Sequence, residues 1–492
     1  MSHLAIEGLQ FGDEGKAKVI GHNFRSGIVD RYGSNFKGAA VVARYQGGAN
    51  AGHTQVLPNG RRVISHQVPS GIIQPGVYNL VFLGTLVEPL LFCGEMDDFE
   101  RMGYPISPER LGIDGRTHVT LMFHREEDGW KPGLAYGQND IGTTGKGIGP
   151  TYTDWVARRG ITFAEFLNPD SFRTALEWNK KKSGRDFDVE EYVKMYDQAR
   201  ERLRPFCVNG LDVIREMEGD WIWEGAQGAL LDIRSGSYPY VTCSSPSLIP
   251  VGCTHKLGIA KAYTTRVDRG EGPLPTELGG IWSAKYCGQG AEHDFFFEVR
   301  EYLGMDLDLG AVRKFQREND VENLQRVQDM AEAWIAANRP MVLGLLNSVD
   351  PFLQGVGLRL VGDEYGATTR RPRRTGWFDA TIVRDAVTVG EIDSIMLTKL
   401  DVLTGIKELT ICTGYKVDGQ EIGTPMDRTE WGRIKPIERK MAGWDVDIRD
   451  VRDFDKLPGE AREYVNEIAD LVDCDIGAIS VGPMAEETIV RK

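Results

Sequence analysis

Residues 8–18 read Gly-Leu-Gln-Phe-Gly-Asp-Glu-Gly-Lys-Ala-Lys and directly follow a short apolar stretch, residues 4–6, that favours a β-strand. A glycine-rich turn between a strand and a helix lets successive backbone N–H groups point at one anion. Lys16 would add a point charge for a phosphate, and Asp13 and Glu14 place carboxylates where a metal ion or a proton is handled. The spacing differs from GxxxxGK[ST], so the segment alone also fits a glycine-rich turn with solvated charges.

Apolar stretches of strand length alternate with amphipathic stretches of helix length along the chain. This alternation predicts an α/β fold with a large, mainly parallel sheet and helices on both faces. The expected strands are residues 4–6, 40–44, 78–83, 118–122, 221–224, 394–398 and 408–415, and the expected helices include residues 18–24, 96–102, 189–202 and 378–388.

Residues 279–360 stand apart from this alternation. A helix is expected after Asp320, which can cap it, and residues 338–340 (Asn-Arg-Pro) are expected to end it. Residues 341–346 then favour a buried strand. We therefore expect one domain over residues 1–492 that carries a folded helix–strand unit at 279–360. The apolar residues at helical spacing are Val321, Leu324, Val327, Ala331, Trp334 and Ile335.

Composition and net charge disfavour several classes of binding partner. The 492 residues carry a net charge of −14, which disfavours a nucleic-acid surface or an anionic membrane as partner. The most apolar run, residues 80–92, is interrupted by Glu88 and Pro89 and is too short to span a bilayer. The seven cysteines are scattered without a CxxC pair. This pattern disfavours a zinc site and fits reduced thiols in the cytoplasm.

Two further glycine-rich segments carry polar side chains suited to a ligand. Residues 44–54 (RYQGGANAGHT) contain Asn50 and His53, and the histidine could donate to developing charge or act as an acid. Residues 141–159 (IGTTGKGIGPTYTDWVARR) offer Thr144 and Lys146 to a phosphate or a carboxylate. Taken singly, the first also fits a turn with a surface histidine, and the second a loop that binds nothing.

Three later segments suit a nucleotide and an acidic ligand. Gln227 lies in a glycine-flanked stretch, and its amide can donate and accept, as reading a base edge requires. Residues 370–374 hold four arginines in five positions, whose forked guanidinium groups suit carboxylates or phosphates. Lys399 and Asp401 follow an expected strand, where the carboxylate could accept from a guanine and the lysine stem could stack on its ring.

Together and in this order, these segments resemble the motifs of the adenylosuccinate synthetase family. The resemblance covers most of the chain outside residues 279–360, and it implies a P-loop NTPase-like α/β domain that works as a homodimer. The matching segments are residues 12–18 (GDEGKAK), 50–54 (NAGHT), 143–150 (TTGKGIGP), 224–228 (EGAQG), 238–242 (YPYVT), 265–277 (TRVDRGEGPLPTE), 368–377 (TTRRPRRTGW) and 398–403 (TKLDVL).

The family joins L-aspartate to C6 of a purine nucleotide, normally IMP, with GTP and Mg²⁺. The resemblance implies that Asp13 takes the N1 proton so that O6 attacks the γ-phosphate, while His53 stabilises the transferring group. The amine of aspartate then displaces phosphate from C6. This order makes physical sense, because an amide-like oxygen is a poor leaving group until it is phosphorylated.

The resemblance also implies a role for each matching residue. The GTP-binding positions are Gly12, Glu14, Gly15, Lys16, Lys18, Lys399, Asp401 and Gly482. The acceptor-nucleotide positions are Asn50, Thr144, Gln227, Thr242, Val267, Arg371 and, from the neighbouring subunit, Arg158. The aspartate positions are Thr368, Thr369, Arg371 and Arg373. The catalytic positions are Asp13, Lys16, His53 and Gln227, and Mg²⁺ would bind Asp13 and the carbonyl of Gly52.

Departures from the family pattern leave the substrate open. Ala17, Trp155 and Arg370 replace a glycine, a lysine and a glycine, Lys146 replaces an arginine, and residues 244–250, 267–272 and 484–485 are altered. One alternative is the same chemistry on dGMP or GMP, which would give a 2-amino-adenylosuccinate for diaminopurine DNA. Another is an inactive nucleotide-binding sensor, against which the retained catalytic positions argue. ATP in place of GTP also stays open.

Overall fold

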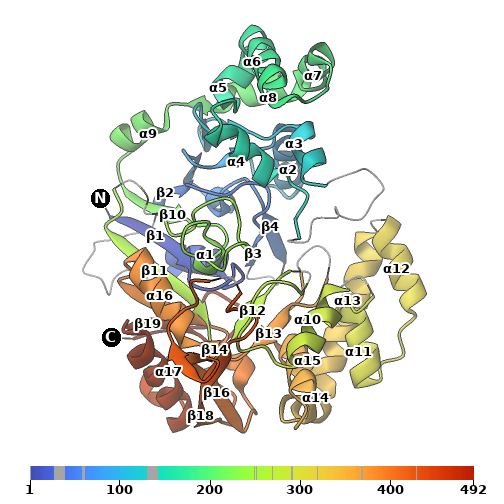
Figure 1. Cartoon of the computed structure of the whole chain (residues 1–492), viewed down its shortest axis with the longest axis vertical. Coiled ribbons are helices and arrows are strands. Elements are labelled where there is room, and N and C mark those ends of the chain that lie inside the picture. Colours follow the sequence, from blue (N-terminus) through green and yellow to red (C-terminus); the bar gives the residue numbers. More distant parts are fainter. Residues whose placement is uncertain are drawn as a thin grey trace.

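The computed structural model places a ten-stranded sheet through the middle of the molecule (Figure 1). Neighbouring strands are parallel except for the last pair, β19 and β20. The structure describes residues 2–26, 39–57, 61–129, 142–248, 250, 252–268, 270–289, 292–318, 320–366, 370–427 and 429–491. The expected α/β fold with a mainly parallel sheet is confirmed.

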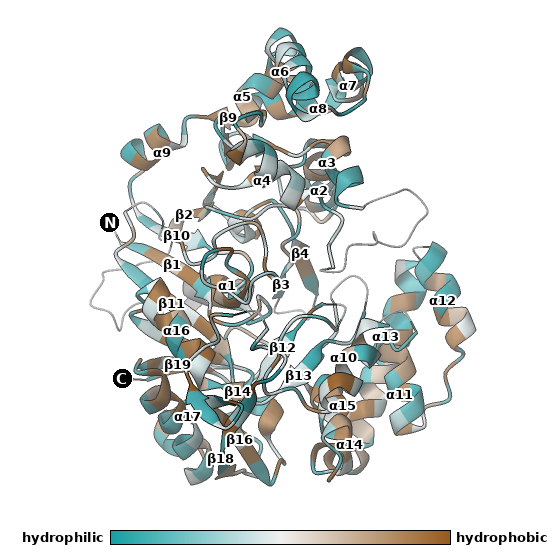
Figure 2. Ribbon diagram, in the orientation of Figure 1, coloured by the Kyte–Doolittle hydropathy of each residue, from teal (hydrophilic) through white to brown (hydrophobic). Residues whose placement is uncertain are grey.

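The sheet strands are short apolar runs buried on both faces, as a parallel sheet covered by helices requires. In Figure 2 the central strands carry brown segments, with teal at several strand ends. In spatial order they are β20 (Thr488–Val490), β19 (Ile476–Ser480), β15 (Ser394–Thr398), β11 (His255–Lys261), β1 (His3–Gly8), β10 (Asp220–Glu224), β2 (Ala39–Arg44), β5 (Tyr78–Val81), β7 (Leu111–Asp114) and β9 (Cys207–Val208).

β1 lies between β10 and β11, with Leu4 opposite Ile222 on one side and His255 on the other. Because these strands are parallel, the segments that follow β1, β2, β10, β11 and β15 all leave the sheet at the carboxyl ends of the strands, which is where α/β proteins place their ligands. The first of these segments leads into α1 (Lys16–Ser26), so residues 9–15 form the expected turn between a strand and a helix.

Other elements surround the sheet. The small strands are β3 (His53–Val56), β4 (Arg62–Ser65), β6 (Leu86–Val87), β8 (His118–Val119), β12 (Thr264–Arg266), β13 (Arg374–Gly376), β14 (Phe378–Asp379), β16 (Glu408–Val417), β17 (Gln420–Ile422) and β18 (Lys435–Ala442). The helices outside residues 279–360 are α2 (Pro89–Arg101), α3 (Met122–Glu127), α4 (Ile148–Val156), α5 (Phe163–Leu167), α6 (Pro169–Ser183), α7 (Val189–Met195), α8 (Asp197–Leu203), α9 (Gly210–Glu216), α16 (Ala380–Gly390) and α17 (Gly459–Val472).

Several expected boundaries were wrong. Of the strand expected at 118–122, only β8 forms, because α3 begins at Met122. The helix expected at 189–202 is interrupted at Tyr196, between α7 and α8. The expected strand at 408–415 is part of β16, which belongs to a separate sheet with β14, β17 and β18.

Residues 279–360 form a helical unit that lies beside the sheet at lower right in Figure 1. The expected helix is α13, and the Asp320 carboxylate caps it by accepting from the N–H of Asn323 at 3.2 Å. The expected strand at 341–346 was wrong, because Pro340 sits in the first turn of α14, where its missing N–H costs nothing. The helices are α10 (Gly280–Gly288), α11 (Phe295–Leu303), α12 (Leu309–Glu318), α13 (Val321–Ala337), α14 (Arg339–Leu346) and α15 (Pro351–Gly362).

The helical unit shares a continuous apolar core with the sheet. Phe295 and Val299 of α11 belong to the same buried cluster as Tyr263 and Leu397. Among the described residues, no helix is long and apolar enough to cross a bilayer.

Candidate functional site

The turn after β1 is braced by its own charged side chains. The Glu14 carboxylate is buried and accepts from the N–H groups of Gly12 at 2.7 Å and Gln10 at 3.1 Å. It also pairs with Lys16 Nζ at 2.8 Å. The alternative of solvated charges is therefore wrong for Glu14 and Lys16, because both serve to hold the turn.

Lys16 joins this turn to the loop after β10. Its ammonium donates to the carbonyl of Gly12 at 3.0 Å and to the carbonyl of Gln227 at 2.6 Å. Gly12 has φ +104°, and a Cβ there would lie 3.2 Å from Gln227 Cα, so only glycine suits the position. The structure thus brings together two of the predicted sites, the 12–18 turn and Gln227.

The amide of Gln227 is buried and is left without a hydrogen-bond partner among the described residues. It faces Gly47 in the loop after β2, where an added Cβ would lie 3.0 Å from Gln227 Oε1. The backbone at Gln227 has φ +54°, a conformation that non-glycine residues rarely adopt. Because an unpaired buried amide is costly, these atoms are suited to a polar ligand.

His53 at the start of β3 pairs through Nδ1 with Glu224, the last residue of β10. Burial on its own would raise the pKa of Glu224, but His53, Arg44 and a hydrogen bond from Ser70 hold it well below its usual range. Burial lowers the pKa of His53, and Glu224 opposes that shift. The ionised carboxylate therefore fixes the ring and leaves Nε2 as the nitrogen for a ligand.

Asp13 is connected to the arginine cluster. Its Oδ2 lies 3.0 Å from Nε of Arg373, and Nη1 of Arg373 lies 2.9 Å from Glu364 Oε2. Glu364 also pairs with Lys261 at 2.8 Å and Lys399 at 3.2 Å. These cations hold the pKa of Glu364 far below its usual range despite burial, and burial lowers the pKa of Lys261 to about 8.

Three predicted GTP positions also lie close together. Lys18 Nζ donates to the carbonyl of Gly482 at 2.5 Å and to Ser480 Oγ at 2.6 Å. Burial lowers the pKa of Lys18 to about 8, and Asp401 opposes that shift. Burial raises the pKa of Asp401, while Lys399 and Lys18 lower it. The hydrogen bonds join α1 to the end of β19 and the loop after it, and Lys18 and Asp401, in the segment after β15, influence each other electrostatically.

The altered stretch 267–272 is built around Asp268. Its carboxylate pairs with Arg266 at 2.7 Å and with Arg374 at 2.9 Å. It also accepts from the N–H of Gly270 at 2.7 Å. Asp268 therefore links the described part of this stretch to Arg266 and to Arg374 of the arginine cluster.

The other predicted positions differ in exposure. Val267, Thr144, Gly52 and Arg158 are exposed, while Oδ1 of Asn50 is buried and has no partner among the described residues. Gly15 is exposed, Thr242 and Arg371 are partly buried, and Thr368 and Thr369 lie outside the described residues.

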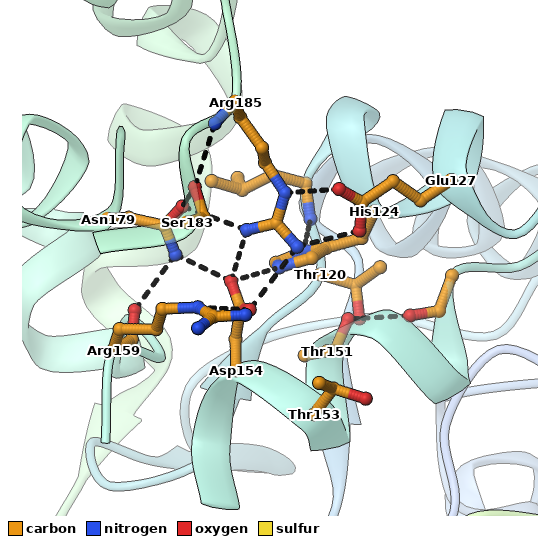
Figure 3. Close-up of polar contacts among 12 residues, drawn as sticks. Thr120, His124, Glu127, Thr151, Thr153, Asp154, Arg159, Asn179, Ser183 and Arg185 are labelled. Carbon is orange, nitrogen blue, oxygen red and sulfur yellow. Dashed lines mark hydrogen bonds and ion pairs between the residues drawn. The ribbon is translucent and has the colours of Figure 1, made fainter. Parts of the chain in front are cut away.

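Arg158 follows α4 and directly precedes Arg159, which belongs to a cluster centred on Asp154 (Figure 3). The Asp154 carboxylate contacts His124 Nε2 at 3.1 Å, Arg159 Nε at 2.8 Å and Arg185 Nη1 at 2.5 Å. Hydrogen bonds from His124 and Arg185 hold its pKa far below the usual range, although burial would raise it. Arg158 itself has φ +60° and projects into solvent beside this cluster.

Sequence reasoning missed three buried charged residues of the site, namely Glu224, Lys261 and Glu364. Each had a signal in the sequence, since Glu224 and Lys261 end apolar strands and Glu364 precedes the arginine cluster. Among the described residues, no group of three or more His, Cys, Asp or Glu side chains could hold a metal ion by itself.

At the carboxyl ends of its parallel strands, this protein has a glycine-rich strand–turn–helix, a buried unpaired amide and several linked basic side chains. This arrangement defines a P-loop NTPase-like, nucleotide-dependent enzyme. The sequence model of the family "adenylosuccinate synthetase" matches residues 5–489, and the chain belongs to this family. It is therefore a ligase of purine biosynthesis with adenylosuccinate synthetase activity, from a family that uses GTP.

Individual relatives agree with this assignment. The adenylosuccinate synthetase of Caldanaerobacter subterraneus subsp. tengcongensis is 35% identical over 514 residues, covering 100% of both chains. That of Magnetococcus marinus is 33% identical over 516 residues, covering 100% of this chain and 98% of the relative.

Two solved structures are similar. The fully ligated adenylosuccinate synthetase of Plasmodium falciparum has a TM-score of 0.72 and 26% identity, covering 99% of each chain. The succinoaminodeoxyadenylate synthetase of cyanophage S-2L, bound to dGMP and dATP, has a TM-score of 0.50 and 15% identity, covering 99% of this chain and 95% of that one. At that identity the second likeness concerns the fold alone.

Proposed function

We propose that this enzyme joins IMP to L-aspartate with GTP, and that Asp13, His53 and Gln227 surround the purine ring. The observation that carries this proposal is the buried, unpaired amide of Gln227, which lies between the 12–18 turn and Gly47. The 6-oxo group of hypoxanthine is an acceptor for the amide N–H of Gln227, which leaves the N1–H for a second acceptor.

Asp13 is the proposed base. Its carboxylate accepts the N1 proton of the purine, so that electron density moves to O6. O6 then attacks the γ-phosphorus of GTP, the bond from that phosphorus to the β,γ-bridging oxygen breaks, and GDP leaves. The ion pair with Arg373 fixes the carboxylate, and through Arg373 it is connected to Glu364. Proton transfer by a positioned side chain of this kind typically contributes about 10²–10⁴-fold in rate.

His53 is the proposed stabiliser of the transferring group. Glu224 holds Nδ1, so Nε2 can carry a proton toward the charge that develops on O6 and the phosphoryl oxygens. Once O6 is phosphorylated, the amine of aspartate attacks C6, its extra proton is released, and inorganic phosphate leaves with the former O6.

Mg²⁺ fits the Asp13 end of this site. The cation binds oxygen atoms and typically uses one or two carboxylates together with substrate phosphates. Asp13, whose side chain is a quarter exposed, and the backbone carbonyl of the exposed Gly52 would hold it. The ion would neutralise charge on the phosphates of GTP.

The remaining GTP contacts would come from two directions. Backbone groups of Gly12, Glu14 and Gly15, with Lys16, would hold the phosphates, in keeping with the strand–turn–helix geometry. Lys18, Lys399, Asp401 and Gly482 would surround the guanine, and their close contacts support a single pocket.

The acidic substrate and the nucleotide phosphate would use the other predicted residues. Arg371, Arg373, Thr368 and Thr369 would bind the carboxylates of L-aspartate, for which forked guanidinium groups are suited. Thr242 and Val267 are the other acceptor positions. Asn50 and Thr144 would bind the 5′-phosphate.

Arg158 would complete the phosphate site from a neighbouring subunit. Its exposed side chain after α4, beside the Asp154 cluster, supports a homodimer in which each subunit supplies one arginine to the phosphate site of the other. A cytoplasmic location remains an expectation from the sequence.

The test is a comparison of acceptors and donors. The enzyme is incubated with Mg²⁺, L-aspartate and GTP or ATP, with IMP, GMP or dGMP as acceptor, and the products are identified by mass. The proposal predicts that IMP with GTP gives adenylosuccinate at the highest rate. Dominant turnover of dGMP or GMP would establish the guanylate alternative instead, and a preference for ATP would overturn the assignment of the guanine pocket.

A further inference from the structure

Residues 363–366 and 370–373 form the two paired arms of the arginine hairpin, which lies between the helical unit 279–360 and the catalytic site. Its two arms are paired by hydrogen bonds from Gly366 N to the carbonyl of Arg371 at 2.8 Å and from Arg373 N to that of Glu364 at 2.9 Å. Adjacent side chains of one arm reach in different directions. Glu364 contacts Lys261 and Arg373, whereas Tyr365 donates its hydroxyl to Glu298 of α11 at 2.5 Å.

Arg370, on the other arm of this hairpin, also contacts the helical unit. It stands where the family pattern has glycine, and its backbone keeps the left-handed conformation, with φ +52°. Residues other than glycine rarely adopt this conformation, because the Cβ crowds the backbone. An arginine at this position is therefore held there by its contacts.

Those contacts enclose the guanidinium group, and the residue is only 8% exposed. Its Cζ lies 4.5 Å from the ring centre of Phe295 and 5.3 Å from that of Tyr365. Nη2 lies 2.9 Å from Asp363 Oδ1. The two rings also contact each other, with their centres 5.1 Å apart, so the guanidinium group packs against an aromatic pair and is paired with a carboxylate.

The backbone of Arg370 is fixed by the same helix. Its carbonyl accepts from the N–H of Phe295 at 3.2 Å, at the start of α11, where helical N–H groups have no partner within the helix. The helix is itself anchored by Glu298, which forms a fully buried ion pair with Arg359 of α15 at 2.7 Å. Phe295 is therefore part of a rigid platform.

We propose that Arg370 is a positioning residue through which the helical unit 279–360 sets the conformation of the arginine hairpin and thereby the affinity for the amino-acid substrate. This inference rests on the proposed function, because it assigns Arg371 and Arg373 of the same hairpin to the carboxylates of L-aspartate. Arg370 itself points into the helical unit and is not required to touch the substrate.

The test compares Arg370→Gly, Phe295→Leu and the double variant with the wild-type enzyme. Glycine restores the residue of the family pattern and suits the left-handed backbone, and leucine keeps an apolar side chain of similar length, so both variants are expected to fold. Arg300→Ala is the matched control, because Arg300 also lies over an aromatic ring of α11, that of Phe297 at 5.9 Å, but is exposed to solvent.

Steady-state kinetics with IMP, GTP and L-aspartate each varied separate positioning from general damage. We expect Arg370→Gly and Phe295→Leu to raise KM for L-aspartate about tenfold, equal to about 1.4 kcal/mol. The KM values for IMP and GTP should stay within about twofold of the wild type. The KM of the double variant for L-aspartate should be no higher than that of Arg370→Gly alone.

An unchanged KM for L-aspartate in an active Arg370→Gly enzyme would overturn the inference, as would equal increases in all three KM values or a fully additive double variant. These outcomes leave the proposed function standing. Absence of wild-type turnover with IMP, GTP and L-aspartate would instead refute the proposed function itself.

Discussion

Replacing Glu224 by glutamine should separate the role of the His53 pair from the stability of the fold. The carboxylate is fully buried and receives Nδ1 of His53, the hydroxyl of Ser70 and the N–H of Ser70, the last at 2.8 Å. A neutral amide offers only one acceptor oxygen to these three donors, so at least one buried donor loses its partner. It also removes the negative charge that supports a proton on the ring.

The expected loss of kcat in Glu224→Gln follows from these contacts. A hydrogen bond to a charged group contributes about 1.5–3 kcal/mol. If that interaction is lost in the transition state, kcat should fall about 10- to 150-fold, because each 1.36 kcal/mol is tenfold in rate. KM for IMP should change little, since the pair acts on charge that develops during phosphoryl transfer. Arg44 also loses a charged neighbour, so the free energy of unfolding should fall.

Glu95→Gln is the matched control. Glu95 is also buried and, like Glu224, supports the charge of Arg44, but it accepts from the N–H groups of His66 at 2.6 Å and Gln67 at 2.8 Å instead of contacting His53. Stopped assays at saturating IMP, GTP and aspartate should show a large loss of kcat only for Glu224→Gln, and urea unfolding should show a lower free energy of unfolding for Glu224→Gln. A Glu224→Gln enzyme with near-normal kcat, or equal losses of kcat in both variants, would refute the reasoning.

Three further outcomes are expected. Asp13→Asn should lower kcat by at least about 10²-fold while calorimetry still detects GTP binding, and a rate close to wild type would contradict its role as base. Burial raises the pKa of Glu7 to about 7 from 4.5. The cost of ionising it in the fold is absent below pH 4.5 and complete above pH 7, so Glu7→Gln should raise the free energy of unfolding by up to about 3 kcal/mol at pH 8 and little at pH 4.5. The same gain at both pH values in urea titrations would disprove this. Asp320→Ala should cost about 1 kcal/mol in urea unfolding through loss of the α13 cap, and an unchanged midpoint would show that the cap is dispensable.

Local patterns were sufficient for much of the fold. The apolar runs at 40–44, 221–224 and 394–398 became β2, β10 and β15 because each is too short for a helix and is buried on both faces. Asp320 marked the start of α13 for a similar reason, since capping depends on the chain within three residues.

The failures arose where the local pattern allowed two structures. Residues 341–346 are a short apolar run, which periodicity cannot assign to a strand or a helix. Residues 338–340 end α13 as expected, but Pro340 also lies in the first turn of a second helix, α14, which the sequence did not indicate. The core contacts of Val342 and Leu346 with the rest of the helical unit decided the outcome.

The site was only partly predictable for a different reason. Motifs identified the residues that would face a ligand, such as Asp13, His53 and Gln227. The residues that hold them in place pair over long distances in sequence. Glu224 is 171 residues from His53, and Glu364 is 103 residues from Lys261. Only the folded sheet brings such partners together.

The most direct measurement of the proposed chemistry follows the oxygen at C6. IMP labelled with ¹⁸O at that position is converted with GTP and L-aspartate, and the inorganic phosphate released is analysed by mass. If Asp13 and His53 promote attack of O6 on the γ-phosphate, each phosphate carries one ¹⁸O atom. Phosphate free of the label, with adenylosuccinate formed at the normal rate, would contradict transfer of the phosphoryl group to the purine.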